Sequence, residues 1–205
     1  MTLPAPTPSG SPVSILAFAA GLGGANGNSA ALVARAIEQF GDLARVRVVS
    51  LVDEPGFEPH REAIAEAEGF VFATGTYWDS WSSPLQRFLE QATPSEGTDL
   101  WLGKPASVLV TAHSVGGKGV LSRLQGVLCT FGCAIPPMSG IVVKLASQAA
   151  LESANDDHVL DFWCPDDLEI VNHNLLEAAR GTRRFRSWEV DRKDPARRWI
   201  RAERR

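Results

Sequence analysis

Five short apolar segments alternate along the chain with segments in which apolar residues recur every three or four positions. The first pattern is typical of strands buried on both faces, and the second of amphipathic helices. The expected strands cover residues 13–20, 46–52, 69–75, 104–113 and 140–146. The expected helices cover residues 30–40, 61–68, 84–91, 120–132 and 168–180. We interpret residues 147–167 as a long acidic connection.

This alternation predicts an α/β fold. Each crossover helix must pack on the sheet and the crossovers share one hand, so the strands form a parallel sheet with helices on both faces. Five strands are the number in the flavodoxin-like doubly wound fold, whose strand order is 2-1-3-4-5. In that order the connections after strands 1, 3 and 4 meet at the carboxyl ends of the strands. We therefore expect the functional site in these three connections.

Length and composition favour one soluble domain. The chain has 205 residues, 44% of them hydrophobic and 21% charged, and no apolar run approaches the roughly 20 residues that span a bilayer. We expect a flexible proline-rich tail over residues 1–12, a flavodoxin-like domain over 13–182 and a basic extension over 183–205. Residues 1–12 lack the features of a signal peptide, so we expect a cytoplasmic protein without membrane contact.

Charge and cysteine content narrow the function classes. The net charge of -4 argues against a general nucleic-acid binder. The basic end is expected to be a solvated extension, with contact to an acidic partner or to the body of the molecule as alternatives. Cys129, Cys133 and Cys164 form no CxxC pair, so neither an iron–sulfur cluster nor a structural zinc is expected. For Cys164 we expect packing, with a redox thiol as the alternative.

The first of the three connections, at residues 21–29, has the sequence GLGGANGNS and leads into a helix. Small residues let the backbone approach a phosphate, and the free N–H groups at a helix start favour an anion. A glycine-rich turn that serves packing alone is the alternative. The candidate phosphate-binding residues are Gly23, Asn26, Asn28 and Ser29.

The second connection, at residues 74–83, has the sequence TGTYWDSWSS. Its large rings exceed what a turn requires and predict a surface for a flat ligand, although they could instead fold back over the sheet edge. Trp81 also offers a ring face, whereas Trp101 is expected in a polar segment away from the site. The candidate ligand-binding residues are Thr76, Tyr77, Trp78, Asp79 and Ser80.

The third connection, at residues 113–119, has the sequence HSVGGKG. A flavin fits the flat ligand that the second connection predicts. The glycines of the third connection let backbone N–H groups approach the edge of the flavin ring, and a nearby cation favours negative charge on the reduced flavin. Taken singly, His113 equally suits a strand end and Lys118 a solvated helix start. The candidates here are His113, Ser114, Gly116, Gly117 and Lys118.

Three segments together resemble the NAD(P)H-dependent FMN reductase branch of the flavodoxin-like superfamily. They are SILAFAAGLGGANGNSAAL, GFVFATGTYWDSWSSPLQRFLEQ and SVLVTAHSVGGKGVLSRLQGVLCTFGCAIPP. The family's first loop commonly reads GSPRKNGNT, and its second contains P-x-Y-x-x-S. The matching residues are Gly21, Gly27, Asn28 and Ser29 in the first loop, Tyr77 and Ser80 in the second, and Gly116, Gly117 and Gly119 in the third.

The first loop also departs from the family pattern. Leu22 and Gly24 stand where the family has its phosphate-binding serine and arginine, and Thr74 or Gly75 stands near the usual proline of the second loop. The departure predicts a phosphate site built from backbone N–H groups between Gly23 and Ser29 and from side chains, with weak FMN binding.

The resemblance implies hydride transfer from NADH or NADPH to FMN, followed by electron release to a flavin, a quinone or another small acceptor. It also implies a homodimer or homotetramer. Such chemistry needs no protein nucleophile, so we expect no catalytic residue in the chain itself.

Two alternatives to this function remain open from the sequence. One is a flavodoxin-like domain that has lost flavin turnover and binds a partner. The other is a Rossmann-type NAD enzyme that uses Asp53 as its ribose acid, although Asn26 stands where that fingerprint needs its third glycine.

Overall fold

Five parallel strands form one sheet in the centre of the molecule. The computed structural model describes residues 11–153 and 162–181. The strands are β1 (Val13–Ala19), β2 (Ala44–Ser50), β3 (Gly69–Gly75), β4 (Ala106–Ala112) and β5 (Gly140–Lys144). They lie in the order β2-β1-β3-β4-β5, and every neighbouring pair is parallel. The flavodoxin-like strand order predicted from the sequence is therefore confirmed.

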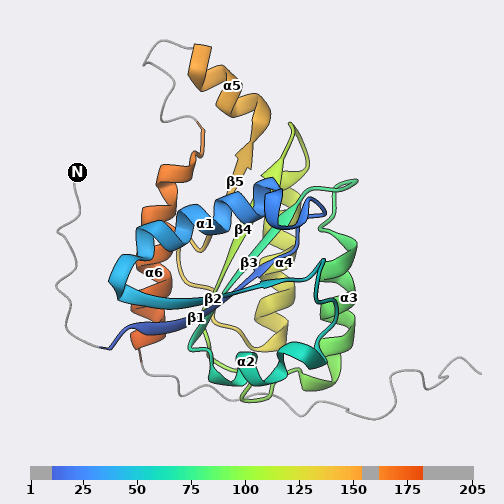
Figure 1. Cartoon of the computed structure of the whole chain (residues 1–205), viewed down its shortest axis with the longest axis vertical. Coiled ribbons are helices and arrows are strands. Elements are labelled where there is room, and N and C mark those ends of the chain that lie inside the picture. Colours follow the sequence, from blue (N-terminus) through green and yellow to red (C-terminus); the bar gives the residue numbers. More distant parts are fainter. Residues whose placement is uncertain (1–10, 154–161, 182–205) are drawn as a thin grey trace, which may run out of the picture.

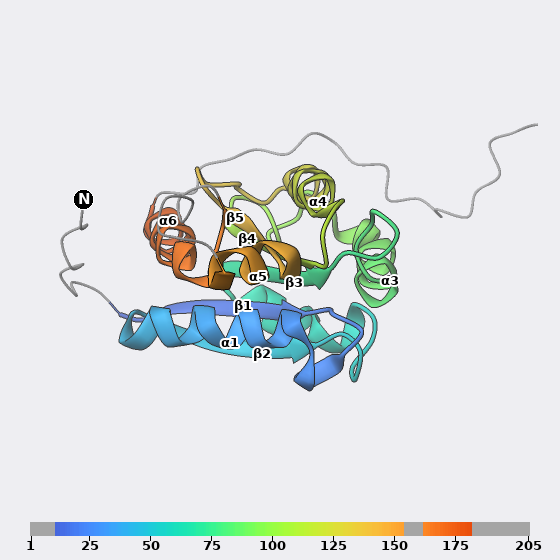
Figure 2. The same ribbon diagram turned by 90° about the horizontal axis from the view of Figure 1, so that it is seen from above.

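Helices cover both faces of this sheet (Figure 1, Figure 2). One face carries α1 (Asn28–Phe40) and α6 (Leu168–Arg180), and the other carries α2 (Arg61–Glu66), α3 (Ser83–Ala92) and α4 (Gly117–Phe131). A further helix, α5 (Leu145–Ser153), follows β5 directly. The 3₁₀ helices are η1 (Gly24–Asn26), η2 (Gly41–Leu43), η3 (Glu58–His60), η4 (Thr93–Ser95) and η6 (Pro165–Asp167).

The largest difference from the sequence-based expectation is α5. Residues 145–153, with the sequence LASQAALES, form a helix, where we expected the end of a strand and a long acidic connection. Ala, Leu, Gln and Glu are strong helix formers, so local propensity favours the helix. In Figure 1, α5 projects beyond the carboxyl end of β5. Residues 1–10 of the predicted tail at 1–12, and all of the predicted extension at 183–205, lie outside the described residues.

Aromatic side chains dominate the core on the α2, α3 and α4 face. Phe18, Phe72 and Phe88 are fully buried, with the Phe18 and Phe72 rings stacked at 4.8 Å. Trp101 belongs to the same core: it is 1% exposed, and its Nε1 donates a hydrogen bond to Ser95 Oγ at 2.8 Å. The sequence analysis placed Trp101 in a polar segment and did not predict that its ring is buried, with its indole N–H satisfied by the Ser95 hydroxyl inside the core.

Candidate functional site

A cavity of about 1320 Å³ lies at the carboxyl ends of the central strands. It is lined by all three connections that the sequence singled out, which are separated along the chain but follow neighbouring strands. Nine of the fourteen candidate residues line it: Gly23, Asn28, Ser29, Thr76, Tyr77, Trp78, Asp79, His113 and Ser114. The other five candidates, which are Asn26, Ser80, Gly116, Gly117 and Lys118, are not among its lining residues. Asp53, the residue of the Rossmann alternative, is not among them either.

The N-terminus of α1 opens into the cavity. The helix begins at Asn28, and its N-cap residue Gly27 provides no side-chain hydrogen bond to the first turn. The first helical bond of the backbone is donated by Ala31 N to Gly27 O. The N–H groups of Asn28 and Ser29 therefore remain available, and the helix dipole adds a positive potential there.

The loop before α1 makes fewer N–H groups available than we expected. Gly24 N donates to Gly21 O and Gly27 N donates to Gly24 O, at 3.0 and 3.1 Å, within the turn that contains η1. A Cβ added to Gly23 would lie 2.8 Å from the Cα of Gly27, so the loop folds tightly on itself and requires glycine there. Two N–H groups of the expected set, those of Gly24 and Gly27, are therefore already paired within the loop.

Ser29 is the buried member of this helix start. It is 3% exposed, and its Oγ lies 3.3 Å from Thr111 Oγ1 at the end of β4. Since a hydroxyl can accept one hydrogen bond and donate another, this pair holds Ser29 in place and leaves hydrogen-bonding capacity toward the cavity.

The aromatic connection forms a tight two-residue turn. Tyr77 and Ser80 exchange backbone hydrogen bonds of 2.8 and 2.9 Å. The two corner residues, Trp78 and Asp79, have φ values of 49° and 57°, as in a type I′ hairpin turn, which normally favours Asn-Gly. Non-glycine residues in this region cost on the order of 1 to 3 kcal/mol each. The turn presents Trp78 with its side chain fully exposed at the cavity mouth.

Tyr77 joins this turn to the first loop. Its Oη accepts a hydrogen bond of 2.8 Å from the backbone N–H of Leu22. The side chain of Leu22 itself is half exposed. The residue that replaces the family's serine thus contributes a backbone bond between two walls of the cavity.

Thr76 offers a polar atom to a ligand. Its Oγ1 is buried without a hydrogen-bond partner among the described residues, and the residue lines the cavity. An unpaired buried hydroxyl costs about 1 to 3 kcal/mol. A ligand with hydrogen-bonding groups along its ring edge can satisfy this atom, as can a small shift that exposes it to water.

The third connection contributes only two of its five candidate residues to the cavity lining. His113 and Ser114 are exposed and line the cavity, and His113 O accepts a bond from Ala146 N of α5. Lys118 lies on the first turn of α4, where its Nζ is 4.7 Å from the centroid of the Trp163 ring. This cation–π contact takes Lys118 away from the cavity.

The far wall of the cavity was missed by the sequence analysis. Its residues come from α5 and from the segment before α6: Leu145, Gln148, Cys164, Pro165 and Asp166. Gln148 Nε2 donates to Trp163 O at 3.3 Å, and Arg35 of α1 forms an ion pair of 3.2 Å with Asp166. The hydrogen bonds to Glu38 and Asp166 raise the pKa of Arg35. Only the helix-forming composition of residues 145–153 could have indicated this wall.

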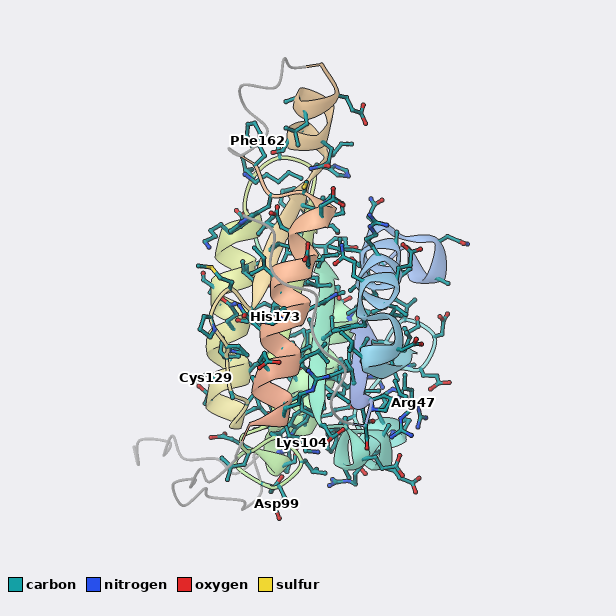
Figure 3. All side chains as sticks on the ribbon, turned by 90° about the vertical axis from the view of Figure 1, so that its left-hand side faces the viewer. Arg47, Asp99, Lys104, Cys129, Phe162 and His173 are labelled. Carbon is teal, nitrogen blue, oxygen red and sulfur yellow. The ribbon has the colours of Figure 1, made fainter. Side chains whose placement is uncertain are left out.

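The three cysteines lie in different environments. Cys164 is partly exposed and lines the cavity, whereas Cys129 is exposed on α4 and is not among the lining residues; Figure 3 shows Cys129 well below Phe162, the residue two positions before Cys164. Cys133 is buried, and this burial raises the pKa of its thiol well above the usual range. Of the three, Cys164 is the one that can contact a ligand in the cavity.

The described residues contain no helix long and apolar enough to cross a membrane. A curated relative from Chelativorans sp. (strain BNC1), named NAD(P)H dehydrogenase (quinone), is 36% identical over 78 residues. The match covers 37% of this chain and 39% of that relative, so this chain spans well under half of the relative's length.

Several solved structures share the fold. The structure of RosB with bound 8-demethyl-8-formylriboflavin-5′-phosphate aligns with a TM-score of 0.63 at 16% identity, over 93% of this chain and 96% of that one. An oxidoreductase from Corynebacterium diphtheriae aligns with a TM-score of 0.64 at 16% identity, over 83% of this chain and 98% of that one. The apo form of the NADH:FMN oxidoreductase EMOB aligns with a TM-score of 0.57 at 21% identity, over 82% of this chain and 88% of that one. At these identities the likeness concerns the fold alone.

A family model described as NADPH-dependent FMN reductase matches residues 13–148. The match covers more than half of the chain and includes all three connections around the cavity. It confirms the resemblance to this family seen in the sequence. The chain belongs to the NADPH-dependent FMN reductase family.

Proposed function

We propose that this chain is an FMN-dependent NAD(P)H oxidoreductase that binds FMN in the cavity at the carboxyl end of the sheet. One observation carries the proposal: the uncapped start of α1 and the aromatic turn face the same cavity. The first suits the phosphate of a flavin mononucleotide, and the second suits its ring. The bound flavin phosphate of the similar RosB structure supports this assignment.

The residues around the cavity have separate roles in this proposal. The N–H groups of Asn28 and Ser29 bind the phosphate, aided by their side chains. The exposed ring of Trp78 offers a stacking surface, and the unpartnered Thr76 Oγ1 offers a hydrogen bond to the ring edge. His113 and Ser114 also line the cavity. Bound FMN would supply the hydride and electron transfer, while these residues bind, orient and exclude water.

The size of the cavity supports binding of a second ring beside the flavin. Its volume of about 1320 Å³ exceeds the roughly 300 to 1,000 Å³ of a typical small-molecule site. The reductant, NADPH or NADH, and then an acceptor can occupy the remaining space in turn. The quinone in the name of the Chelativorans relative supports a quinone acceptor, with a second flavin as the other candidate.

We further propose a homodimer or homotetramer in the cytoplasm. Leu22, Val115 and Leu145 are exposed apolar residues near the cavity, and burial against a second copy would remove them from water. The free thiols of Cys129, Cys133 and Cys164 suit a reducing compartment. Light scattering of the purified protein would test the assembly, and a monomeric mass would contradict it.

The absorption spectrum of the purified protein, before and after addition of FMN, tests the proposed function. We expect flavin absorption that NADPH or NADH bleaches under anaerobic conditions and that an acceptor restores. Because the chain offers one phosphate site and no second nucleotide segment, FMN should bind more tightly than FAD. A folded protein that binds neither flavin would contradict the proposal and favour the alternative of a partner-binding domain.

A further inference from the structure

The turn at Trp78 and Asp79 needs support from outside itself. Both corner residues have positive φ values and neither is glycine, so the isolated chain would leave this conformation readily. The paired backbone bonds between Tyr77 and Ser80 close the turn but also form in turns of other types. Some additional contact must select the left-handed conformation.

Arg123 of α4 makes that contact. Its guanidinium Nη2 donates a hydrogen bond to the carbonyl oxygen of Asp79, 44 positions away in the sequence. The same guanidinium lies 5.9 Å from the centroid of the Trp81 ring, within cation–π range. Its Nε donates to Gly119 O at 3.2 Å, which fixes the side chain along α4. Arg123 thus contacts the turn at its corner residue Asp79 and also contacts Trp81, which follows the turn.

A second contact comes from the start of α4. Gly116 precedes the helix with φ of 82°, and a Cβ added there would overlap the Asp79 carboxylate. The carboxylate therefore lies against the N-terminus of α4, where the helix dipole favours a negative charge. Arg123 thus binds the carbonyl oxygen of Asp79, and the start of α4 lies directly beside its side chain.

We infer that Arg123 is a positioning residue: it keeps the Trp78–Asp79 turn in its left-handed conformation and thereby places the Trp78 ring at the cavity mouth. Arg123 does not line the cavity, so its effect on a ligand must pass through the turn. The inference deepens the proposed function and rests on it for the identity of the ligand, FMN.

The test combines FMN affinity with a direct probe of the Trp78 ring. The protein is labelled with 5-fluorotryptophan, and the ¹⁹F resonance of Trp78 is assigned by its loss in Trp78→Phe. We expect Arg123→Met to shift and narrow this resonance in the FMN-free protein and to weaken FMN binding roughly 5- to 20-fold, because the stacking ring is no longer held in place. Arg123→Lys should give a smaller loss, because lysine keeps the charge but not the planar guanidinium.

Two control comparisons distinguish a positioning role of Arg123 from a general loss of structure. Arg87→Met removes an exposed arginine from the neighbouring α3 and should change neither the resonance nor the affinity. In a Trp78→Ala background, Arg123→Met should add little further loss of FMN affinity, because the ring it positions is gone. A full additional loss in that background, or an unchanged Trp78 resonance in Arg123→Met, would overturn the inference.

The two readouts also distinguish this inference from the proposed function. If the protein binds no FMN, the proposed function fails, but the ¹⁹F resonance still reports whether Arg123 orders the turn. If FMN binds and Arg123→Met alters neither resonance nor affinity, the proposed function stands and the role of Arg123 is wrong.

Discussion

Two tryptophans of this chain occupy opposite environments. Trp101 is 1% exposed, donates a hydrogen bond to Ser95, and contacts the rings of Phe70 and Phe131 at 5.3 and 5.6 Å. Trp78 is 102% exposed, has a φ of 49°, and within the described residues its ring makes no aromatic or cation–π contact. The first residue stabilises the fold. The positive φ of Trp78 costs stability, and its exposed ring gains no packing energy within the described residues. A ring that binds a ligand is expected to show this combination.

The largest expected effect is on stability at Trp101. Trp101→Ala should lower the free energy of unfolding by about 3 to 5 kcal/mol, because it leaves a cavity in an aromatic core and removes the hydrogen bond from the indole N–H to Ser95 Oγ. Urea denaturation followed by circular dichroism would measure it. Trp78→Ala should change the same quantity by less than about 0.5 kcal/mol. Equal losses at the two positions would remove the contrast between them.

The next effect is on ligand affinity at Trp78. Trp78→Ala should weaken FMN binding by about 1 to 3 kcal/mol through the loss of a stacked ring, as measured by calorimetric titration. The matched control is Met138→Ala, which removes an exposed apolar side chain before β5, at the other end of the sheet. Similar losses of affinity for both variants would show that the ring does not bind at this turn.

These two residues also show what the sequence could and could not predict. The strand order and the three converging connections followed from hydrophobic periodicity, because each strand and helix is encoded locally. Local sequence placed Trp78 in the candidate site and Trp101 outside it, but it could not show that Trp101 is buried, since this burial depends on rings from four other segments. The contact of Lys118 with Trp163 and the far wall of the cavity likewise depend on long-range packing.

A smaller effect is expected at the phosphate end. Ser29→Ala should weaken FMN binding by about 1 kcal/mol, the value of one hydrogen bond, and Asn28→Ala should have a similar effect. Leu22→Ser restores the residue of the family pattern and should tighten binding. Titrations of the three variants would measure these changes. No change in any of them, with the fold intact, would place the phosphate elsewhere.

The smallest effect is a difference in thiol labelling. Iodoacetamide should modify Cys129 and Cys164, and FMN should slow the reaction of Cys164 alone, because this residue lines the cavity. Cys133 should stay unmodified in the native protein, because burial raises its pKa and keeps it a thiol. Mass spectrometry of the digested protein distinguishes the three sites. Protection of Cys129 by FMN would indicate a different binding site.

The most direct test of the central claim is a crystal structure of the protein with FMN. We predict the phosphate within hydrogen-bonding distance of the N–H groups of Asn28 and Ser29, and the ring system against Trp78 with a polar edge near Thr76 Oγ1. A flavin bound outside this cavity, or one whose phosphate lies away from the start of α1, would contradict the account.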